Sequence, residues 1–210
     1  MNESKRRIPK KFSKVDKTFI NRLLKNEDNG IFNTFSVFPK KLNFYGKEPE
    51  EDIILVTRSH WIAYVPGFLF ALLFLLLPIL IIFLSNTINL FNSPNVYIGI
   101  LIVGIILCIN ILVTTILKWY YTVNIITDQR IVVVRMDNAF YHLYSEAQLE
   151  KIEDVSHKPI GFWSNIFDVG DVDIDTAGHE VDFHLKTLPK PRELQDVLND
   201  LLEMKQKGKI

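Results

Sequence analysis

Three aspartates at alternate positions are the residues of this chain whose type and spacing come nearest to a chemical site. Asp171, Asp173 and Asp175 are separated by Val172 and Ile174. Alternate residues of a strand share one face, and three carboxylates on one face could ligate a cation. The same alternation is typical of a half-buried strand with apolar residues inward and a solvated acidic face outward. We favour the second interpretation and expect no metal here.

Other groups that catalysis could use do not fall in catalytic patterns. The five histidines are His60, His142, His157, His179 and His184. None stands in the His-Glu-x-x-His spacing of zinc enzymes, and the sequence has no glycine-rich phosphate loop. His179 with Asp175 and Glu180 fits a turn, and the single cysteine, Cys108, allows no disulfide or thiolate cluster within one chain. We therefore expect a protein that is not an enzyme and has no cofactor.

The feature that must organise the rest is a long uncharged apolar stretch. Residues 61–117 contain no Asp, Glu, Lys or Arg. Within them, residues 62–84 and 97–117 are each long enough to cross a hydrocarbon core of about 30 Å, which needs about 20 residues. Neither run has the polar stripe of a buried soluble helix, and residues 85–96 between them are rich in turn formers. The sequence predicts a two-span transmembrane hairpin.

Aromatic residues and charge predict the boundaries and orientation of this hairpin. Trp61, Tyr64, Trp119 and Tyr120 lie at its two ends, as in an interfacial aromatic belt. Residues 1–60 carry 13 Lys/Arg against 8 Asp/Glu, whereas residues 118–210 carry 11 against 16. Basic segments beside spans stay on the cytoplasmic side. We expect a multi-pass protein of the cytoplasmic membrane with both termini in the cytoplasm and no cleavable signal peptide.

The spans themselves offer little chemistry. Asn110, Thr114 and Thr115 are their main polar groups, and all three are uncharged. Transport of ions or protons normally uses ionisable groups inside the membrane. A transporter or channel is therefore disfavoured.

The N-terminal segment combines an apolar and a basic helical face. Between residues 10 and 25 the apolar positions are Phe12, Val15, Phe19, Ile20, Leu23 and Leu24. The basic positions are Lys10, Lys11, Lys14, Lys17, Arg22 and Lys25. Such a helix could lie on an anionic membrane surface. It could also pack on the soluble domain, or be a disordered tail that only sets topology.

After the second run the pattern changes to short strands. Residues 121–126 and 130–135 predict a hairpin around 127–129, and residues 140–144, 149–155, 169–175 and 181–185 predict further strands. A helix is expected from about residue 190, with its apolar stripe at Leu194, Val197, Leu198, Leu201 and Leu202. These elements favour a small β-barrel or sandwich whose open end is closed by the helix.

The order of several short motifs resembles the bacterial PH-domain membrane proteins of the YdbS-like kind. They are RSHW at 58–61, YTV at 121–123, TDQRI at 127–131, KIEDV at 151–155 and GDVDIDTAG at 170–178. The resemblance covers about residues 50–205. It implies an α+β membrane protein in which a two-span helical hairpin is followed by a cytoplasmic PH-like small β-barrel capped by a C-terminal helix. It supplies no catalytic residue.

Two departures from that family concern its charge. Residues 137–150 contain no Lys or Arg, whereas family members often carry basic residues there. The basic segment 1–46 is not part of the family pattern. These departures weaken the hypothesis that the barrel binds acidic lipid headgroups. Any such binding would instead use the basic residues of the N-terminal arm.

We accordingly expect three parts: a basic cytoplasmic arm at 1–60, a transmembrane hairpin at 61–117 and a PH-like domain at 118–206. The expected function is a non-catalytic scaffold or regulator of other membrane proteins. The alternative is binding of anionic lipid headgroups through the arm or the PH-like domain. The expected partners are membrane lipid and either another membrane protein or a second copy of the chain, but no nucleic acid.

One aromatic segment could provide a contact surface. Phe162, Trp163 and Phe167 lie in a loop or single helical turn at 161–170. They are either partly exposed for interaction, or they plug the barrel mouth beneath the final helix.

Overall fold

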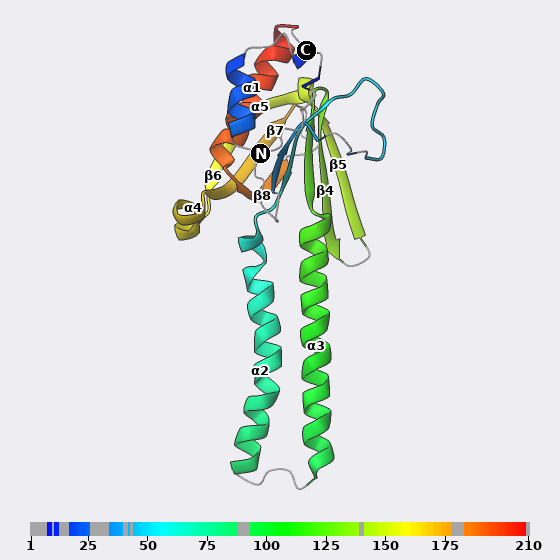
Figure 1. Ribbon diagram of the computed structural model, residues 1–210, viewed down its shortest axis with the longest axis vertical. Helices are drawn as coiled ribbons and strands as arrows, with labels where there is room; N and C mark the ends of the chain where they lie inside the picture. The colour runs from blue at the N-terminus through cyan, green and yellow to red at the C-terminus, as the bar shows by residue number, and fades with distance from the viewer. Residues whose placement is uncertain are drawn as a thin grey trace, which may run out of the picture. The chain divides into compact units, whose positions relative to one another are not determined.

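The computed structural model describes residues 8–9, 11–12, 17–25, 34–39, 42, 44–87, 93–138, 141–177 and 183–208. The chain forms two compact units (Figure 1). The sheet domain comprises residues 1–60, 122–135 and 142–210. The helical unit comprises residues 61–121 with the short segment 136–141. The N-terminal arm and the PH-like domain expected from the sequence therefore form one unit.

The larger sheet of the domain has five strands in the order β1-β2-β3-β4-β5. Their bounds are β1 Phe35–Val37, β2 Ile53–Arg58, β3 Val123–Thr127, β4 Arg130–Asn138 and β5 Tyr141–Gln148. The predicted hairpin is confirmed: the Thr127 hydroxyl accepts the backbone N–H groups of Gln129 at 3.2 Å and Arg130 at 3.0 Å. Strand β2 pairs antiparallel with β3, with Arg58 opposite Val123. The helical unit is thus inserted between two hydrogen-bonded neighbours of one sheet.

The smaller sheet has the order β6-β7-β8. Its strands are β6 Ile152–Pro159, β7 Val169–Thr176 and β8 Phe183–Pro189, with helix α4 (Gly161–Phe167) between the first two. A 3-10 turn, η3 at Leu149–Lys151, carries the chain from one sheet to the other, and β6 then bonds to β7. Among the described residues the two sheets do not close into a barrel. The expected small β-barrel is therefore corrected to two sheets.

One apolar core fills the space between the sheets and the last helix, α5 (Pro191–Gln206). Val172 and Ile174 of β7 are fully buried, as the alternation predicts. Leu194, Val197, Leu198 and Leu201 are fully buried too, which confirms most of the predicted stripe of α5.

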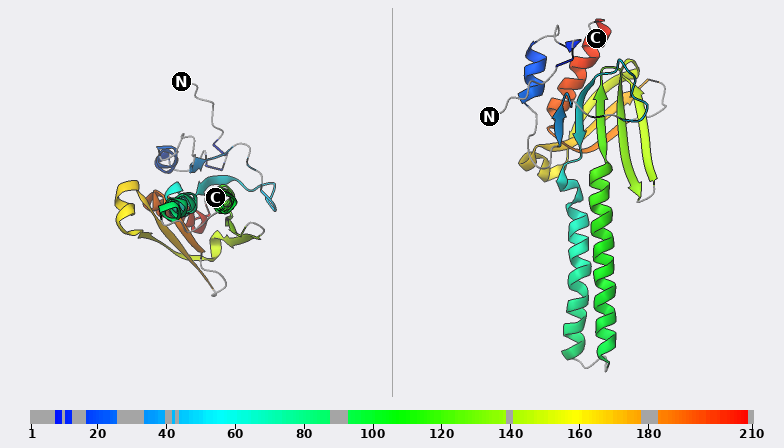
Figure 2. Two further views of the ribbon diagram at one scale, coloured as in Figure 1. Left: turned by 90° about the horizontal axis from the view of Figure 1, so that it is seen from below. Right: turned by 45° about the vertical axis from the view of Figure 1, so that its right-hand side comes forward.

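Helix α1 (Lys17–Lys25) lies beside α5 (Figures 1 and 2). Its Phe19, Ile20 and Leu23 join the core together with Phe12. The apolar face of this segment is therefore occupied by the domain, which corresponds to the alternative of a helix packed on the domain. Val15 lies outside the described residues.

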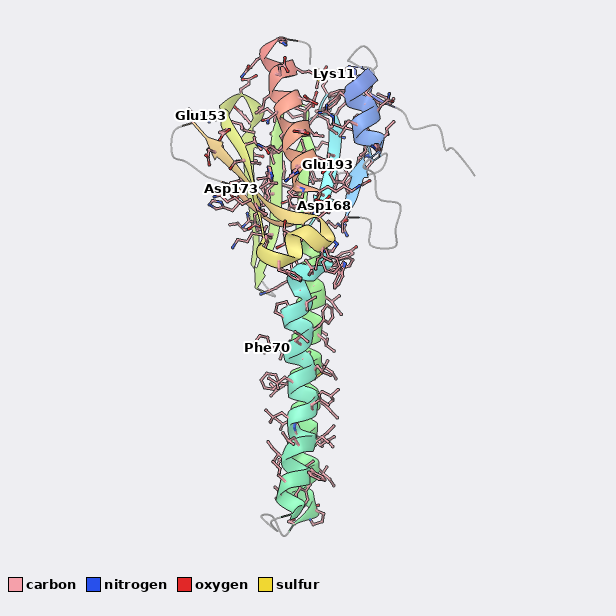
Figure 3. The ribbon with its side chains drawn as sticks, turned by 90° about the vertical axis from the view of Figure 1, so that its left-hand side faces the viewer. Lys11, Phe70, Glu153, Asp168, Asp173 and Glu193 are labelled. Atoms are coloured by element: carbon pink, nitrogen blue, oxygen red, sulfur yellow. The ribbon has the colours of Figure 1, made fainter. Side chains whose placement is uncertain are left out.

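The helical unit consists of η2 (Trp61–Tyr64), α2 (Val65–Thr87) and α3 (Pro94–Tyr121), and α2 packs along α3 (Figure 2). By length and composition, Trp61–Ser85 and Pro94–Tyr121 could each cross a membrane. Large apolar side chains such as Phe70 project outward from the pair (Figure 3).

Small residues line the contact between the two helices. Ala71, Gly104 and Cys108 are buried. A Cβ on Gly104 would overlap the ring of Pro78 and come within 3.0 Å of the Phe74 carbonyl oxygen. The helices therefore approach each other closely at a position where one of them has no side chain.

Candidate functional site

The three alternating aspartates do not form one solvated face. Asp175 is exposed, whereas the Asp171 carboxylate accepts the Thr187 backbone N–H at 2.7 Å. Asp173 is buried and binds Lys158 at 2.6 Å and His184 at 2.8 Å. The hydrogen bond from Lys158, followed by that from His184, lowers the pKa of the Asp173 carboxyl. Neighbouring strands supply these partners, because His184 of β8 lies directly opposite Asp173.

Metal coordination finds no support in this arrangement. Within the described part of the chain, no three His, Cys, Asp or Glu side chains are grouped so that they could hold a metal ion.

Arg130 is the centre of the most extensive polar network of the domain. It donates to both carboxylate oxygens of Glu51, at 3.0 and 2.9 Å, and to Glu146 at 2.8 Å. It also donates to the Gly46 carbonyl at 2.5 Å and lies 5.8 Å from the centre of the Phe44 ring. The Glu51 side chain is completely buried. This bidentate pair fixes the segment before β2 to the turn between β3 and β4.

The electrostatics of Glu51 follow from these contacts. Burial alone would raise its pKa, but hydrogen bonds from Arg130, the Glu48 backbone and Thr127 outweigh burial and lower it. The hydrogen bond to Glu51 in turn raises the pKa of Arg130. Both groups are therefore held in their charged forms.

A second pair closes the other side of the same turn. Lys11 binds the buried Asp128 carboxylate at 2.7 Å, and the Asp52 backbone N–H donates to the same carboxylate at 2.9 Å. The hydrogen bond to Asp128 raises the pKa of Lys11. Residues from the N-terminal segment therefore complete the turn between β3 and β4.

Beside these pairs lies a cleft of about 410 Å³ within the sheet domain. Its charged lining residues are Lys11, Arg130, Lys151 and Lys205 against Glu48, Asp128, Glu146 and Glu150. Lys205 lies 3.5 Å from Glu150, and the pairs above occupy Lys11 and Arg130. Because the lining is balanced and largely paired, it differs from the clustered cations of a phosphate-binding site.

Helix α4 presents a different kind of surface. Phe162 is 74% exposed, Ile166 55% and Phe167 36%. The aromatic side chains of Phe162 and Phe167 therefore face outward. Trp163 lies in α4, but its side chain is outside the described part. Sequence reasoning missed Ile166, although its spacing of four from Phe162 places both on one helical face.

A tightly bonded corner holds α4. The Phe167 ring lies 6.2 Å from the His60 ring, centre to centre. The His60 backbone N–H donates to the Thr187 carbonyl at 2.7 Å, and the Lys190 N–H donates to the Asp168 carbonyl at 2.8 Å. The end of β2 and the end of α4 are thus fixed to the same strand, β8, and its following turn.

The predicted membrane-surface lysines and arginine have several fates. Lys11 pairs with Asp128, Arg22 pairs with Asp200 at 3.0 Å, and Lys25 is exposed. Lys10 and Lys14 lie outside the described residues, and Lys17 is described only as the first residue of α1. Their contact with a membrane surface stays a prediction.

The predicted interfacial aromatics lie at adjoining ends of the helical unit. The Tyr64 hydroxyl lies 3.5 Å from the Lys118 carbonyl, which brings the start of the first helix next to the end of the second. Trp61 and Tyr120 are exposed. Trp119 and Tyr64 are half-buried.

Comparison with known proteins identifies the family. A family model described as "Bacterial PH domain" matches residues 61–202, which include the helical unit and most of the sheet domain. No curated protein and no solved structure matches the chain. The match covers well over half of the sequence, and the chain therefore belongs to the bacterial PH domain family.

Proposed function

We propose that this protein is an integral membrane protein whose helical hairpin anchors a non-catalytic PH-like interaction module at the cytoplasmic face of the membrane. The module acts as a scaffold or regulator for another membrane protein or for further copies of the chain. Anchoring raises its effective concentration near other membrane proteins.

One observation carries this proposal: α2 and α3 expose their large apolar side chains and bury small ones. Leu80 is 57% exposed and Phe83 69%, while Ala71 and Gly104 are buried. Water would penalise so much apolar surface, whereas lipid tails would not. The inserted position of the pair, between β2 and β3, supports a role for the sheet domain as the part that the anchor presents.

The charges of the domain favour protein contact over headgroup binding. The basic side chains Lys11, Arg22 and Arg130 already have carboxylate partners. A headgroup would have to displace these partners, and the cleft offers as many negative as positive charges. Lipid-headgroup binding through the arm or the domain is therefore the less supported alternative.

Topology is tested by cysteine labelling in whole cells. In a Cys108→Ala background, an impermeant maleimide should label Ser93→Cys in intact cells. It should label Gln206→Cys only after permeabilisation. Labelling of position 206 in intact cells would contradict the cytoplasmic assignment, and equal labelling of both sites only after permeabilisation would contradict a membrane-spanning hairpin.

The scaffold role is tested by photo-crosslinking of the full-length protein in cells. A photoreactive residue at Lys151, an exposed position in the cleft, should capture a membrane protein or a second copy in stoichiometric yield. The matched control places the same group at Glu153, which is exposed on β6 outside the cleft. Equal and substoichiometric capture at both positions would contradict a specific interaction surface.

A further inference from the structure

Helix α4 exposes several large apolar side chains close together. Phe162, Ile166 and Phe167 expose three large apolar side chains within a helix of seven residues. Scattered apolar residues are normal on a surface, but adjoining aromatic and aliphatic groups mark a contact with something apolar. The question is which partner this face meets.

Chain connectivity indicates the partner. The ring of Phe167 lies 6.2 Å from that of His60, and His60 directly precedes Trp61, the first residue of a candidate span. If Trp61 lies at the membrane interface, its neighbour His60 lies close to that interface. The ring contact of His60 with Phe167 then places α4 close to the interface as well. The position follows from bonds within the sheet domain and from the covalent chain.

Hydrogen bonds and close packing fix the position of α4 in the sheet domain. Ser59 donates to the Lys186 carbonyl at 3.0 Å, and His60 donates to the Thr187 carbonyl at 2.7 Å. A Cβ on Gly170, which follows α4, would come within 2.8 Å of the Lys158 carbonyl oxygen and 2.9 Å of Pro191. Close packing on one side and hydrogen bonds on the other leave α4 little freedom to turn its apolar face elsewhere.

Charged residues of both signs flank α4. Lys186 is exposed, and Lys190, the residue before α5, donates its backbone N–H to the Asp168 carbonyl at the end of α4. Asp168 (Figure 3) and Asp171, whose carboxylate accepts the Thr187 backbone N–H at 2.7 Å, are acidic residues at the same corner. Apolar groups that enter the acyl boundary with lysines at headgroup level are the usual arrangement of an interfacial helix.

We infer that α4 is a second membrane contact, in which Phe162, Ile166 and Phe167 insert into the headgroup–acyl boundary of the lipid bilayer. This inference rests on the proposed membrane anchor. The hairpin and α4 would then hold the sheet domain to the bilayer at separate points, which restricts how the domain can tilt.

The test measures depth in the full-length protein in a Cys108→Ala background. The protein is reconstituted in vesicles of about three parts phosphatidylcholine to one part phosphatidylglycerol, so that the surface is anionic. A fluorophore on Ile166→Cys is quenched either by aqueous iodide or by a lipid nitroxide near the headgroups. We expect iodide quenching about threefold weaker than for Tyr45→Cys, together with quenching by the lipid nitroxide, since an interfacial helix lies about 5–10 Å deep. Tyr45 is the matched control because its ring is 92% exposed on the same domain.

A label on Leu80→Cys tests the membrane anchor separately from the α4 contact. If position 80 is protected from iodide while position 166 behaves like position 45, the anchor stands and the α4 contact is wrong. If position 80 is itself reached by iodide, the proposed anchor fails. Protection of position 166 from both quenchers would also overturn the inference, because protein, such as a second copy, would then cover α4.

A substitution provides an independent check. Phe162→Ser combined with the label at position 166 should raise iodide quenching at least about twofold, because it removes the most exposed apolar side chain from the boundary. Tyr45→Ser should leave quenching at position 166 unchanged. An unchanged value in Phe162→Ser would contradict insertion.

Discussion

The sheet domain and the helical unit place the same residue types on opposite sides. In the sheet domain, leucines such as Leu194 and Leu201 are fully buried. In α2 and α3, leucines such as Leu80 and Leu84 are more than half exposed, and the interior holds Ala71 and Gly104. The two units therefore differ in which side chains they expose.

Charged residues repeat this contrast. The domain buries Glu51 and Asp128, each with a cationic partner, whereas residues 61–117 contain no Asp, Glu, Lys or Arg. In a domain surrounded by water, paired charges can be buried at the edge of the apolar core. In lipid, an unpaired charge would cost more than a hairpin of two helices could readily offset. This contrast is the one expected if the proposed anchor lies in lipid and the sheet domain in water.

The largest effect is expected where the domain depends on a buried charge. Arg130→Ala would leave Glu51 buried without its partner. The free energy of unfolding should therefore fall by about 3–5 kcal/mol. The measurement is urea unfolding of the full-length protein in detergent, followed by circular dichroism. Arg22→Ala is the control, because its exposed pair with Asp200 contributes about 1 kcal/mol or less. Equal losses in both variants would mean that burial of Glu51 has no energetic consequence.

The contrast between the surroundings is sharpened by adding a charge to each unit. Leu80→Lys should impair membrane insertion of α2, by less than the about 2.5–3.5 kcal/mol of a lysine at the centre of a span, because position 80 lies towards the end of α2 at Thr87. Tyr45→Lys, at an exposed site of the domain, should have no effect. A glycosylation-based insertion assay of α2 measures the first and expression of folded protein the second. If Leu80→Lys is harmless, the exposed face of α2 meets water.

Packing inside the helical unit gives the next effect. Gly104→Ala should destabilise the pair by about 1–3 kcal/mol, because the added methyl group overlaps Pro78. Gly99→Ala is its matched control, since a Cβ there meets nothing within 4 Å. Thermal unfolding of the purified protein in detergent would compare them. Similar midpoints would show that the helices separate freely enough to accept a side chain at position 104.

The smallest effect concerns pH. The pKa of Asp173 is lower in the folded protein than its ordinary value of about 3.9, so its stabilisation is present above that value. It is lost as the pH falls through the folded pKa. Asp173→Asn should lose about 1 kcal/mol at neutral pH and show a shallower decline in acid. Urea unfolding between neutral and acidic pH measures this, and an identical acid slope in both proteins would contradict the role of Asp173.

The elements with local signals could be predicted from sequence alone. The hairpin at 127–129 has turn residues between two β-branched runs, and α5 has a complete apolar stripe. The apolar helices follow from length and composition alone. The separation of the three alternating aspartates could not be predicted, because the partners of Asp173 come from neighbouring strands.

The strand pairing and ion pairs of the N-terminal segment could not be predicted for a related reason. Strand β1 has three residues, and β2 pairs with a strand that follows 65 positions later, from Arg58 to Val123. The local sequence pattern of a strand does not indicate a partner so far away along the chain. The Arg130–Glu51 pair has the same origin, since its members lie on opposite sides of the inserted helices. The sequence left packing of the basic helix on the domain as one alternative, and the structure adds the pairing of β2 with β3 and the Arg130–Glu51 pair.

The insertion of the helices between β2 and β3 also sets the timing of biosynthesis. When β2 leaves the ribosome, its neighbour β3 does not yet exist, and at about 5–20 residues per second the delay lasts several seconds. During that interval β2 has an unpaired edge, and only a nascent chain that has produced both helices can cover it. Completion of the domain would thus report that the hairpin has been made, and a chain stalled within the helices would keep an open edge that quality control could recognise.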